Sequence, residues 1–512
     1  MTSSPRPTAA TVPRRELYLV FAGLMLALAL ASLDQNIVST ALPRIVSDLG
    51  GLAHLSWVVT AFMVASTSTA PLYGKLSDMY GRKPLFFTAI IIFLIGSILC
   101  GAAQTMLQLI LFRAVQGLGA GGLITLAQTT VSDLIAPRER GRYQGLFGAV
   151  FAACSVAGPL LGGFITDALS WRWIFYVNLP VGAAALALIA IGLRRHCQTV
   201  THRIDYAGAV LLTCGTVCLL LFLSWGGAVY PWLSPVMLAL AFAAPLFYGL
   251  LVREERRAAE PILPPRLFRN PVFVVATSVI GLNAMALFGS LVFLPLFFQL
   301  VLGASPSHAG LMMAPMMGGV IVAAVIGGRL VSATGRYKIF PVVGLVTGFC
   351  AFSTLAWAAM AGSGLAVIEP ALILLGCGFG LVMPNLTVAL QNSVSRGDMG
   401  VATSVTAFIR SLGGALGVAV AGAVVAFRMR RLLPPEWTVP GAARPSLLEM
   451  GVQQIGRIPL DQRTVLLSAY RHAIATTFMT GAGVAALAFA VVLFLPERPL
   501  RDTVAASERA GY

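Results

Sequence analysis

The sequence predicts an all-α polytopic membrane protein with about fourteen transmembrane helices. Of its 512 residues, 58% are hydrophobic and 11% are charged, and the mean hydropathy is +0.86. Soluble domains carry about 25% charged residues, so these values exclude an ordinary soluble protein. The apolar residues gather in runs of about 20, the length of a helix that crosses the ~30 Å hydrocarbon layer. Little of the chain is left for a soluble domain.

The apolar runs, bounded by charged or turn-forming residues, predict where the spans lie. They fall near residues 17–37, 55–75, 84–104, 106–128, 144–168, 173–193, 205–226, 234–252, 271–300, 308–330, 339–361, 364–391, 401–427 and 471–495. The last two spans have the weakest boundaries, because Arg428, Arg430 and Arg431 abut the end of the run 401–427.

Basic residues predict the orientation of the chain. With the N-terminus in the cytoplasm, the short outer loops carry only Arg44 and Arg172, and most other basic residues fall on the cytoplasmic side. An even number of spans then puts both termini in the cytoplasm. The net charge of +16 is therefore interpreted as topology and not as a nucleic-acid surface. We expect a multi-pass protein of the cell inner (cytoplasmic) membrane.

Two segments resemble one another: Gly74–Lys83 and Gly328–Tyr337. Each follows the second span of a predicted group of six, and such parallel repeats build transporters from two bundles. We expect a cytoplasmic tail at 1–16, a six-helix bundle at 17–193, a linker with two extra transmembrane helices at 194–270, a second six-helix bundle at 271–495 and a cytoplasmic tail at 496–512.

Other classes of function find little support. The sequence contains no GxxxxGK[ST] loop, so nothing indicates ATP as the energy source. Its 7 cysteines form no CxxC pair and its 5 histidines are scattered, which argues against a metal site. No loop carries a nucleophile with a base, so we expect neither an enzyme nor a cofactor. A membrane-embedded enzyme or a receptor is a disfavoured alternative.

Three charged residues lie deep within predicted spans, away from the span ends: Asp34, Arg113 and Arg410. A charge at the bilayer centre costs at least about 2.5 to 3.5 kcal/mol, so each needs a partner or a function. Asp34 and Arg113 lie at comparable depth, and we expect them to meet in the first bundle. A carboxylate beside an arginine can switch its protonation when water access changes, which suits proton coupling. The alternative is that Asp34 only caps the outer end of its span.

Arg410 lies near mid-depth in its span. It could be a counter-charge in the second bundle, contact an anionic substrate, or pair with backbone carbonyls at Gly413 and Gly414. Together with Arg410, further polar residues of the spans predict the lining of a substrate cavity: Gln35, Asn36, Gln116, Asn283, Gln299 and Asn385.

Six ordered motifs resemble the major facilitator superfamily, and more closely its fourteen-span drug/proton antiporter branch. They are Leu33–Pro43, Gly74–Lys83, Arg113–Gly119, Gly158–Gly163, Trp171–Pro180 and Glu260–Phe268. The resemblance covers nearly the whole chain. It implies a fold of two six-helix bundles with two inserted helices.

The resemblance implies a cytoplasmic gate at Gly74, Asp78, Gly81, Arg82 and Lys83. A glycine turn lets two helices approach, and a carboxylate there can sit at the positive N-terminal end of a helix from the other bundle. We expect that helix to begin near Val401. In the repeat, Ser332 replaces the acid, so the latch would be asymmetric.

The resemblance also identifies Gly158, Pro159, Gly162 and Gly163 as an antiporter motif. These residues break the hydrogen-bond ladder and offer close packing at one face. Two interpretations stay open, a kink that seals the protein against proton leak and a tight helix contact.

These observations predict a proton-coupled antiporter that exports hydrophobic, drug-like compounds by alternating access. The alternative is a facilitator-fold transporter of one specific metabolite. The expected partners are a small-molecule substrate, protons and membrane lipid, with no nucleic acid; a periplasmic adaptor could serve as a further partner.

Overall fold

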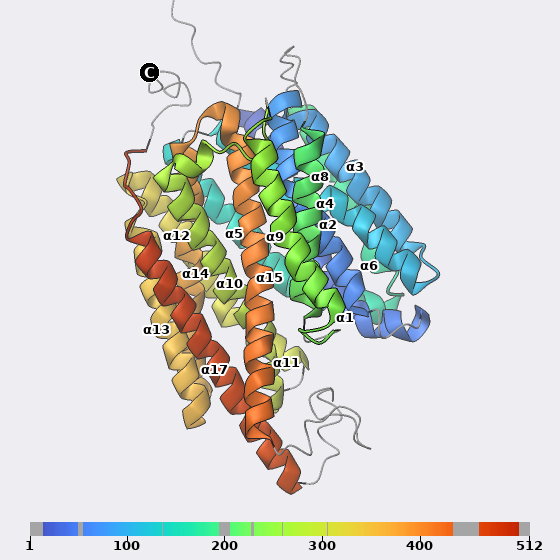
Figure 1. Cartoon of the computed structure of the whole chain (residues 1–512), viewed down its shortest axis with the longest axis vertical. Helices are drawn as coiled ribbons and strands as arrows, with labels where there is room; N and C mark the ends of the chain where they lie inside the picture. Colours follow the sequence, from blue (N-terminus) through green and yellow to red (C-terminus); the bar gives the residue numbers. More distant parts are fainter. Residues whose placement is uncertain are drawn as a thin grey trace, which may run out of the picture.

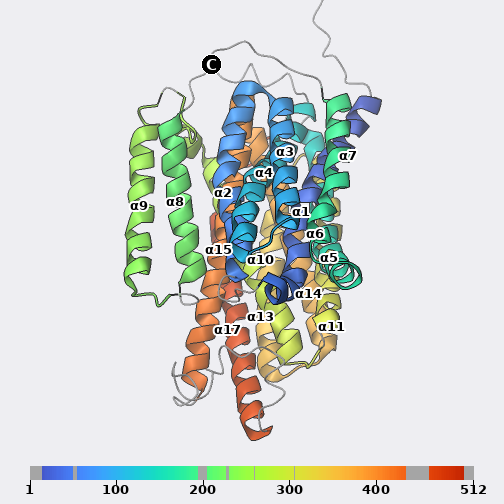
Figure 2. The same ribbon diagram turned by 90° about the vertical axis from the view of Figure 1, so that its right-hand side faces the viewer.

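The computed structural model describes residues 14–49, 55–135, 137–193, 205–226, 230–258, 260–304, 306–433 and 460–500. Over these residues the chain is almost entirely helical, and the long helices run side by side (Figure 1; Figure 2). Within this described part, 13 helices are long and apolar enough to cross a membrane. The prediction of a multi-pass helical membrane protein is confirmed.

The first helices correspond to the first six predicted spans. They are α1 (Arg14–Leu49), α2 (Leu55–Tyr80), α3 (Arg82–Gly101), α4 (Met106–Leu134), α5 (Pro137–Ala168), α6 (Trp173–Tyr176) and α7 (Asn178–Gly192). The predicted span 173–193 is therefore two helices that meet at Val177. Pro180 explains the break, because it has no N–H to donate to the carbonyl of Tyr176 four residues earlier.

The second part of the chain continues the pattern. Its helices are α8 (Tyr206–Trp225), α9 (Pro235–Glu255), α10 (Pro271–Leu300), α11 (Pro306–Leu311), α12 (Ala314–Thr334), α13 (Ile339–Ala361), α14 (Leu365–Ser393), α15 (Met399–Leu432) and α17 (Leu460–Val492). The predicted span 308–330 is divided, because α11 ends at Leu311 and α12 begins with Pro315 in its first turn. Proline suits that place, since the first N–H groups of a helix have no intrahelical acceptor.

Helix α2 is less apolar than the prediction of about fourteen apolar spans requires. It is 26 residues long, yet it is not among the 13 apolar helices of the described part. The hydroxyl-rich run Ser66–Thr69 lowers its hydropathy. The hydroxyls of Ser66, Ser68 and Thr69 are satisfied within the helix, for example by Ser68 donating to the carbonyl of Val64 at 2.7 Å. α2 also packs against α4 and α15, so protein and not lipid covers much of it.

The three longest helices of the described part far exceed the length that a bilayer requires. α1, α15 and α17 have 36, 34 and 33 residues, or about 50 Å each at 1.5 Å per residue. The ends of α15 and α17 project together beyond the other helices (Figure 1; Figure 2). α17 begins at Leu460, earlier than the predicted residue 471, and the exposed Arg428, Arg430 and Arg431 lie on this projection. These arginines therefore need not enter the hydrocarbon layer.

The long helices pack as two groups. In the first group, α1 packs against α5 and α7, and α4 packs against α2 and α3. In the second group, α14 packs against α12 and α13, and α10 packs against α15 and α17. Separate apolar cores hold the groups, one around Leu24 and Phe86 and another around Phe298 and Leu375. Contacts of α5 with α12 and of α2 with α15 join them.

Helices α8 and α9 form a pair beside these groups (Figure 2). An apolar cluster links Leu212 and Leu251 of the pair with Leu72 of α2 and Phe408 of α15. The pair therefore contacts both groups from the same side. The domain boundaries expected at 17–193, 194–270 and 271–495 stay predictions, and most of the tails 1–16 and 496–512 lies outside the described residues.

Candidate functional site

Asp34 and Arg113 form an ion pair inside the first group of helices. Arg113 Nη1 lies 2.6 Å from Asp34 Oδ2, and the two side chains are 1% and 0% exposed. Asp34 lies in the interior of α1, well before the helix ends at Leu49. This position excludes the alternative that Asp34 caps the outer end of the helix.

Both oxygens of the Asp34 carboxylate accept hydrogen bonds. Oδ2 accepts from Arg113, while Oδ1 accepts from Gln116 Nε2 and from Asn178 Nδ2, each at 2.9 Å. Gln116 and Asn178 also donate to Ser97 Oγ, at 3.2 and 2.9 Å. The network therefore ties α1, α3, α4 and α7 together at one point.

The Arg113 guanidinium has further partners. It donates to Gln116 Oε1 at 2.8 Å and to the carbonyl of Val58 at 3.3 Å, and its Cζ lies 4.1 Å from the centroid of the Phe62 ring. A buried ion pair is stable only with such additional partners, because both charges have lost their hydration. Removing one charge would leave the other uncompensated.

Two glycines let the helices of this network approach each other. A Cβ atom at Gly96 of α3 would lie 2.5 Å from the backbone N of Gln116, and one at Gly117 of α4 would lie 2.5 Å from the carbonyl O of Phe62. Both distances are too short for a real side chain. Small residues at such crossings are how membrane helices pack closely, and here they position Arg113 and Gln116.

Asp78 joins the two groups of helices. Its Oδ1 and Oδ2 accept hydrogen bonds from the N–H groups of Gly400 and Val401, each at 3.0 Å, at the N-terminal end of α15. These N–H groups have no acceptor within their own helix and carry the positive end of its dipole, so a carboxylate is favoured there. Gly74 permits the approach, because a Cβ atom at that position would lie 2.5 Å from the carbonyl O of Gly400.

Arg82 connects this contact with α4. Its Nη2 lies 2.6 Å from Asp78 Oδ1, its Nε donates to Asp133 Oδ2 at 2.8 Å, and it also donates to Ser77 Oγ. Burial raises the pKa of Asp78 from 3.8 to about 6, although the Arg82 charge and the N–H of Val401 act in the opposite direction. The site is therefore an electrostatic junction of four helices, α2, α3, α4 and α15.

The other two residues of this motif have separate positions. Gly81 has φ of 88°, a conformation that glycine adopts without strain, and it forms the turn between α2 and α3. Lys83 does not join the junction, because its Nζ donates to the carbonyl of Ala190 on α7 at 2.7 Å. In the second copy of the repeat, Ser332 donates to the carbonyl of Gly328 within α12.

The residues of the expected antiporter motif lie on α5, whose helical conformation continues from Pro137 to Ala168. A Cβ atom at Gly158 would lie 2.5 Å from Asn36 Cβ, so α5 packs tightly on α1 close to Asp34. Gly162 is buried, while a Cβ atom at Gly163 would have nothing within 4 Å. The Pro159 side chain lies outside the described part of the structure. The tight helix contact is thus present at Gly158.

The polar residues expected to line one cavity are dispersed. Gln116 belongs to the Asp34 network, and Asn283 and Asn385 are buried. Gln35 is exposed, while Asn36, Gln299 and Arg410 are partly exposed. Asn36 Nδ2 donates to the carbonyl of Ser32, and Asn385 Nδ2 donates to that of Leu381, both at 2.7 Å.

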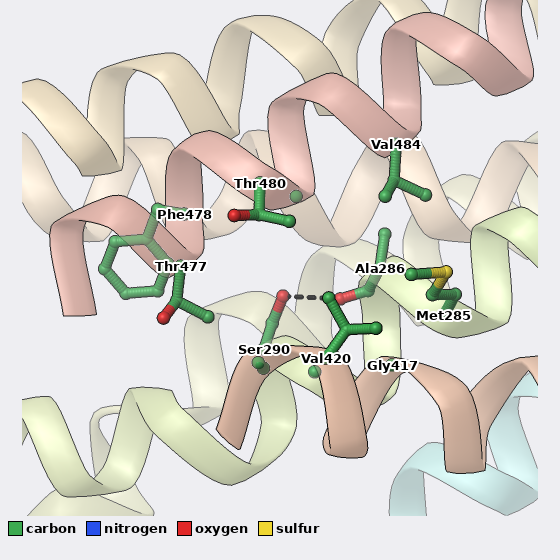
Figure 3. A pocket seen from close by; sticks show the side chains of 12 residues that line it. Met285, Ala286, Ser290, Gly417, Val420, Thr477, Phe478, Thr480 and Val484 are labelled. Carbon is green, nitrogen blue, oxygen red and sulfur yellow. Dashed lines mark hydrogen bonds between the residues drawn. The ribbon is translucent and has the colours of Figure 1, made fainter. Parts of the chain in front are cut away.

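Figure 3 shows a small pocket between α10, α15 and α17, where Ser290, Thr477 and Thr480 supply hydroxyls. Ser290 Oγ donates to the carbonyl of Ala286 at 2.7 Å. None of the residues predicted from the sequence lines this pocket, and no titratable side chain does. The pocket therefore offers no group for proton transfer.

Sequence reasoning missed four groups of the network and the junction: Ser97, Asn178, Asp133 and the carbonyl of Val58. Asn178 could have been predicted from the sequence, because it is a polar residue in the apolar run of the motif Trp171–Pro180. The Val58 carbonyl could not have been predicted from the sequence, since every residue carries such an acceptor.

Comparisons with known proteins agree with this structure. The sequence matches the Major Facilitator Superfamily over residues 24–418. It is 40% identical over 415 residues to the multidrug transporter protein MdtP of Bacillus subtilis, covering 81% of this chain and 76% of that protein. It is 37% identical over 493 residues to an uncharacterised MFS-type transporter of Mycobacterium tuberculosis, covering 94% of this chain and 70% of that protein.

Solved structures show the same fold. The human organic anion transporter MFSD10 superposes with a TM-score of 0.61 at 17% identity, covering 94% of this chain and 99% of that one. The sequence match, the relatives and the packing of the helices agree. The chain belongs to the major facilitator superfamily.

Proposed function

We propose that this protein is a proton-coupled antiporter that exports hydrophobic, drug-like compounds across the cell inner membrane by alternating access. The observation that carries the proposal is the buried Asp34–Arg113 pair at 2.6 Å. A carboxylate enclosed in this way is a suitable proton site, because its charge state decides how many hydrogen bonds it can accept. The relative named as a multidrug transporter supports the substrate class.

Asp34 is the coupling residue in this proposal, and Arg113 is its charged partner. The ionised carboxylate accepts three hydrogen bonds, from Arg113, Gln116 and Asn178. Protonation neutralises the carboxylate and weakens all three, so the tie between α1, α4 and α7 loosens. A proton that enters from outside supplies ~2.3 kcal/mol per 100 mV of membrane potential, which drives export without ATP.

The Asp78 junction is the proposed cytoplasmic gate. It bridges α2 of the first group and α15 of the second through the bonds to Gly400 and Val401. An inward-facing state requires these bonds to break, since the groups must separate on this side. The arrangement seen here is therefore interpreted as closed to the cytoplasm. The moving units are the bundles 17–193 and 271–495, with the pair in 194–270 inserted and both termini cytoplasmic.

The Gly158 contact is the proposed seal. It presses α5 onto Asn36, two residues after Asp34, and leaves no room for even a methyl group. Close packing at this place excludes water from the side of the network. The motif thereby limits proton leak when no substrate is moved.

The experiment is export of a panel of cationic, neutral and anionic dyes from cells that lack other pumps. We expect several dyes to be exported by the unmodified protein, and we expect both Asp34→Asn and a protonophore to reduce export at least about tenfold. Asp48→Asn is the matched control, because Asp48 lies on the same helix outside the network and accepts a bond from Trp171 Nε1.

Two outcomes would contradict the proposal. Export by Asp34→Asn that stays sensitive to the protonophore would remove Asp34 from the coupling step. Export of none of the dyes, with the protein confirmed in the membrane, would favour the transporter of one specific metabolite.

A further inference from the structure

Arg410 is a cation deep in the second group of helices. It lies on α15, eleven residues after Met399, or about 16 Å along the helix axis. This depth is comparable to the middle of the ~30 Å hydrocarbon layer. A charge at such a place needs a compensating group.

The structure provides Arg410 with no such group. Among the described residues, its guanidinium makes no hydrogen bond and no ion pair. The guanidinium of Arg113, unlike that of Arg410, has several partners: the carboxylate of Asp34, the amide oxygen of Gln116 and the ring of Phe62. The deep charges of the first group therefore compensate each other, while the charge of Arg410 is left over.

The contacts of α15 define the direction in which Arg410 points. Gly400 and Ser404 face Gly74 on α2, while Ile409 and Gly413 face Gly281 on α10. Phe408 and Leu412 belong to the apolar cluster with α8 and α9.

At 100° per residue, Arg410 lies on the opposite side of α15 from Phe408 and Leu412. The pair α8–α9 lies outside the two groups (Figure 2), so the opposite side faces the interior. The side chain is partly exposed although it is deep within the protein. It therefore points towards the interior of the protein and not towards lipid.

The surroundings of Arg410 on this face suit an amphipathic ligand. Thr403, two turns earlier, has a buried hydroxyl without a hydrogen-bond partner among the described residues. Gly414, one turn later, packs against the Phe288 ring, which would lie 2.9 Å from a Cβ atom there. The face thus combines a cation, a free hydroxyl and an aromatic wall.

We propose that Arg410 binds the anionic group of the substrate, and that the exported compounds include amphipathic organic anions, carboxylates above all. The planar guanidinium donates two parallel hydrogen bonds to a carboxylate, which a lysine cannot do. The inference deepens the proposed export function and rests on it. Export of a monoanion with uptake of one proton moves two charges, so the membrane potential drives it more steeply than export of a neutral compound.

The test uses a matched pair of fluorescent probes, 1-pyrenebutyric acid and its methyl ester, which differ in one negative charge. Binding to the purified full-length protein is measured at pH 7.5 without any gradient, so the result does not depend on proton coupling. We expect the acid to bind at least about tenfold more tightly than the ester. Arg410→Gln should remove this preference while ester binding stays within about twofold, and Arg410→Lys should retain only part of it.

Arg428→Gln is the matched control, since Arg428 is exposed on the same helix and its loss should change neither affinity. Equal affinity of the unmodified protein for acid and ester would overturn the proposal, even if Arg410→Gln failed to fold. An equal loss of both affinities in a folded Arg410→Gln protein would also overturn it.

Transport of the same probes in proteoliposomes with an imposed proton gradient separates the two proposals. Binding that prefers the acid, combined with transport that ignores the gradient, would sustain the role of Arg410 and contradict proton coupling.

Discussion

Asp78 and Val401, which are 323 residues apart in the sequence, are joined by a 3.0 Å hydrogen bond at the first turn of α15. The bond connects a side chain of one helical group to the backbone of the other. Because the acceptor is a carboxylate and the donor belongs to a helix N-terminus, charge and dipole both favour it.

The first prediction concerns pH. The pKa of Asp78 is about 6 in the closed arrangement, against 3.8 for the same group in water. The closed state therefore binds a proton more tightly than the open state, so a fall in pH from about 7 towards 4 favours closure. The free energy of closure changes by at most about 3 kcal/mol over this range. This stabilisation is lost as the pH rises through about 6.

Hydrogen exchange of the peptide that contains Gly400 and Val401 measures this effect. After correction for intrinsic exchange rates, its protection should be greater at pH 5 than at pH 7.5. Asp78→Asn is neutral at both values, so its protection should not change with pH. A pH dependence that survives in Asp78→Asn would assign the effect to another group.

The second prediction concerns Gly158 and Gly163, which lie in one motif but differ in their surroundings. Gly158→Ala would force a Cβ atom to 2.5 Å from Asn36 Cβ, whereas Gly163→Ala meets nothing within 4 Å. We expect Gly158→Ala to lower stability by about 1 to 3 kcal/mol through overpacking, and Gly163→Ala to be neutral within about 0.5 kcal/mol. Thermal unfolding in detergent compares the two, and equal effects would argue against tight packing at Gly158.

The third prediction concerns the ion pair. Arg113→Gln leaves the Asp34 carboxylate buried without its cation and should destabilise the protein by about 3 to 5 kcal/mol. Adding Asp34→Asn removes the uncompensated charge, so the double variant should be more stable than Arg113→Gln alone. A double-mutant cycle measures the coupling, and strictly additive effects would contradict a direct interaction.

The fourth prediction is that the ion pair between Lys75 and Glu260 contributes little to stability and to export. Lys75 Nζ lies 3.8 Å from Glu260 Oε2, and the two side chains are 19% and 29% exposed. Pairs that water reaches contribute less than about 1 kcal/mol. Glu260→Gln should therefore leave export and thermal stability almost unchanged, and a large loss would show that Glu260 has a further role.

The sequence was most informative where a physical rule acts on single residues. The cost of burying a charge singled out Asp34 and Arg113, and counting residues along the helices placed them at comparable depth. The gate at Asp78 came from the resemblance to the superfamily, and the helix start near Val401 came from an apolar run. The preference of carboxylates for helix N-termini explains why the two meet.

Partners that depend on helix rotation could not be obtained in this way. Asn178 reaches Asp34 because the helix breaks at Val177 and α7 begins anew, a local geometry that hydropathy does not report. The early start of α17 at Leu460 was missed because its first turns are polar and project beyond the other helices (Figure 1). The cavity prediction gathered polar residues by type, although Gln116 faces the ion pair.

The pair α8–α9 covers the line where α2 meets α15, directly beside the Asp78 junction. Acyl chains of the bilayer would otherwise reach this line and could wedge between the two helices whenever they part. The covering contacts of Leu212, Leu251, Leu72 and Phe408 are apolar, so they impose no directional bonds that must break during movement. The pair therefore places protein, and not lipid, along this side of the contact between α2 and α15.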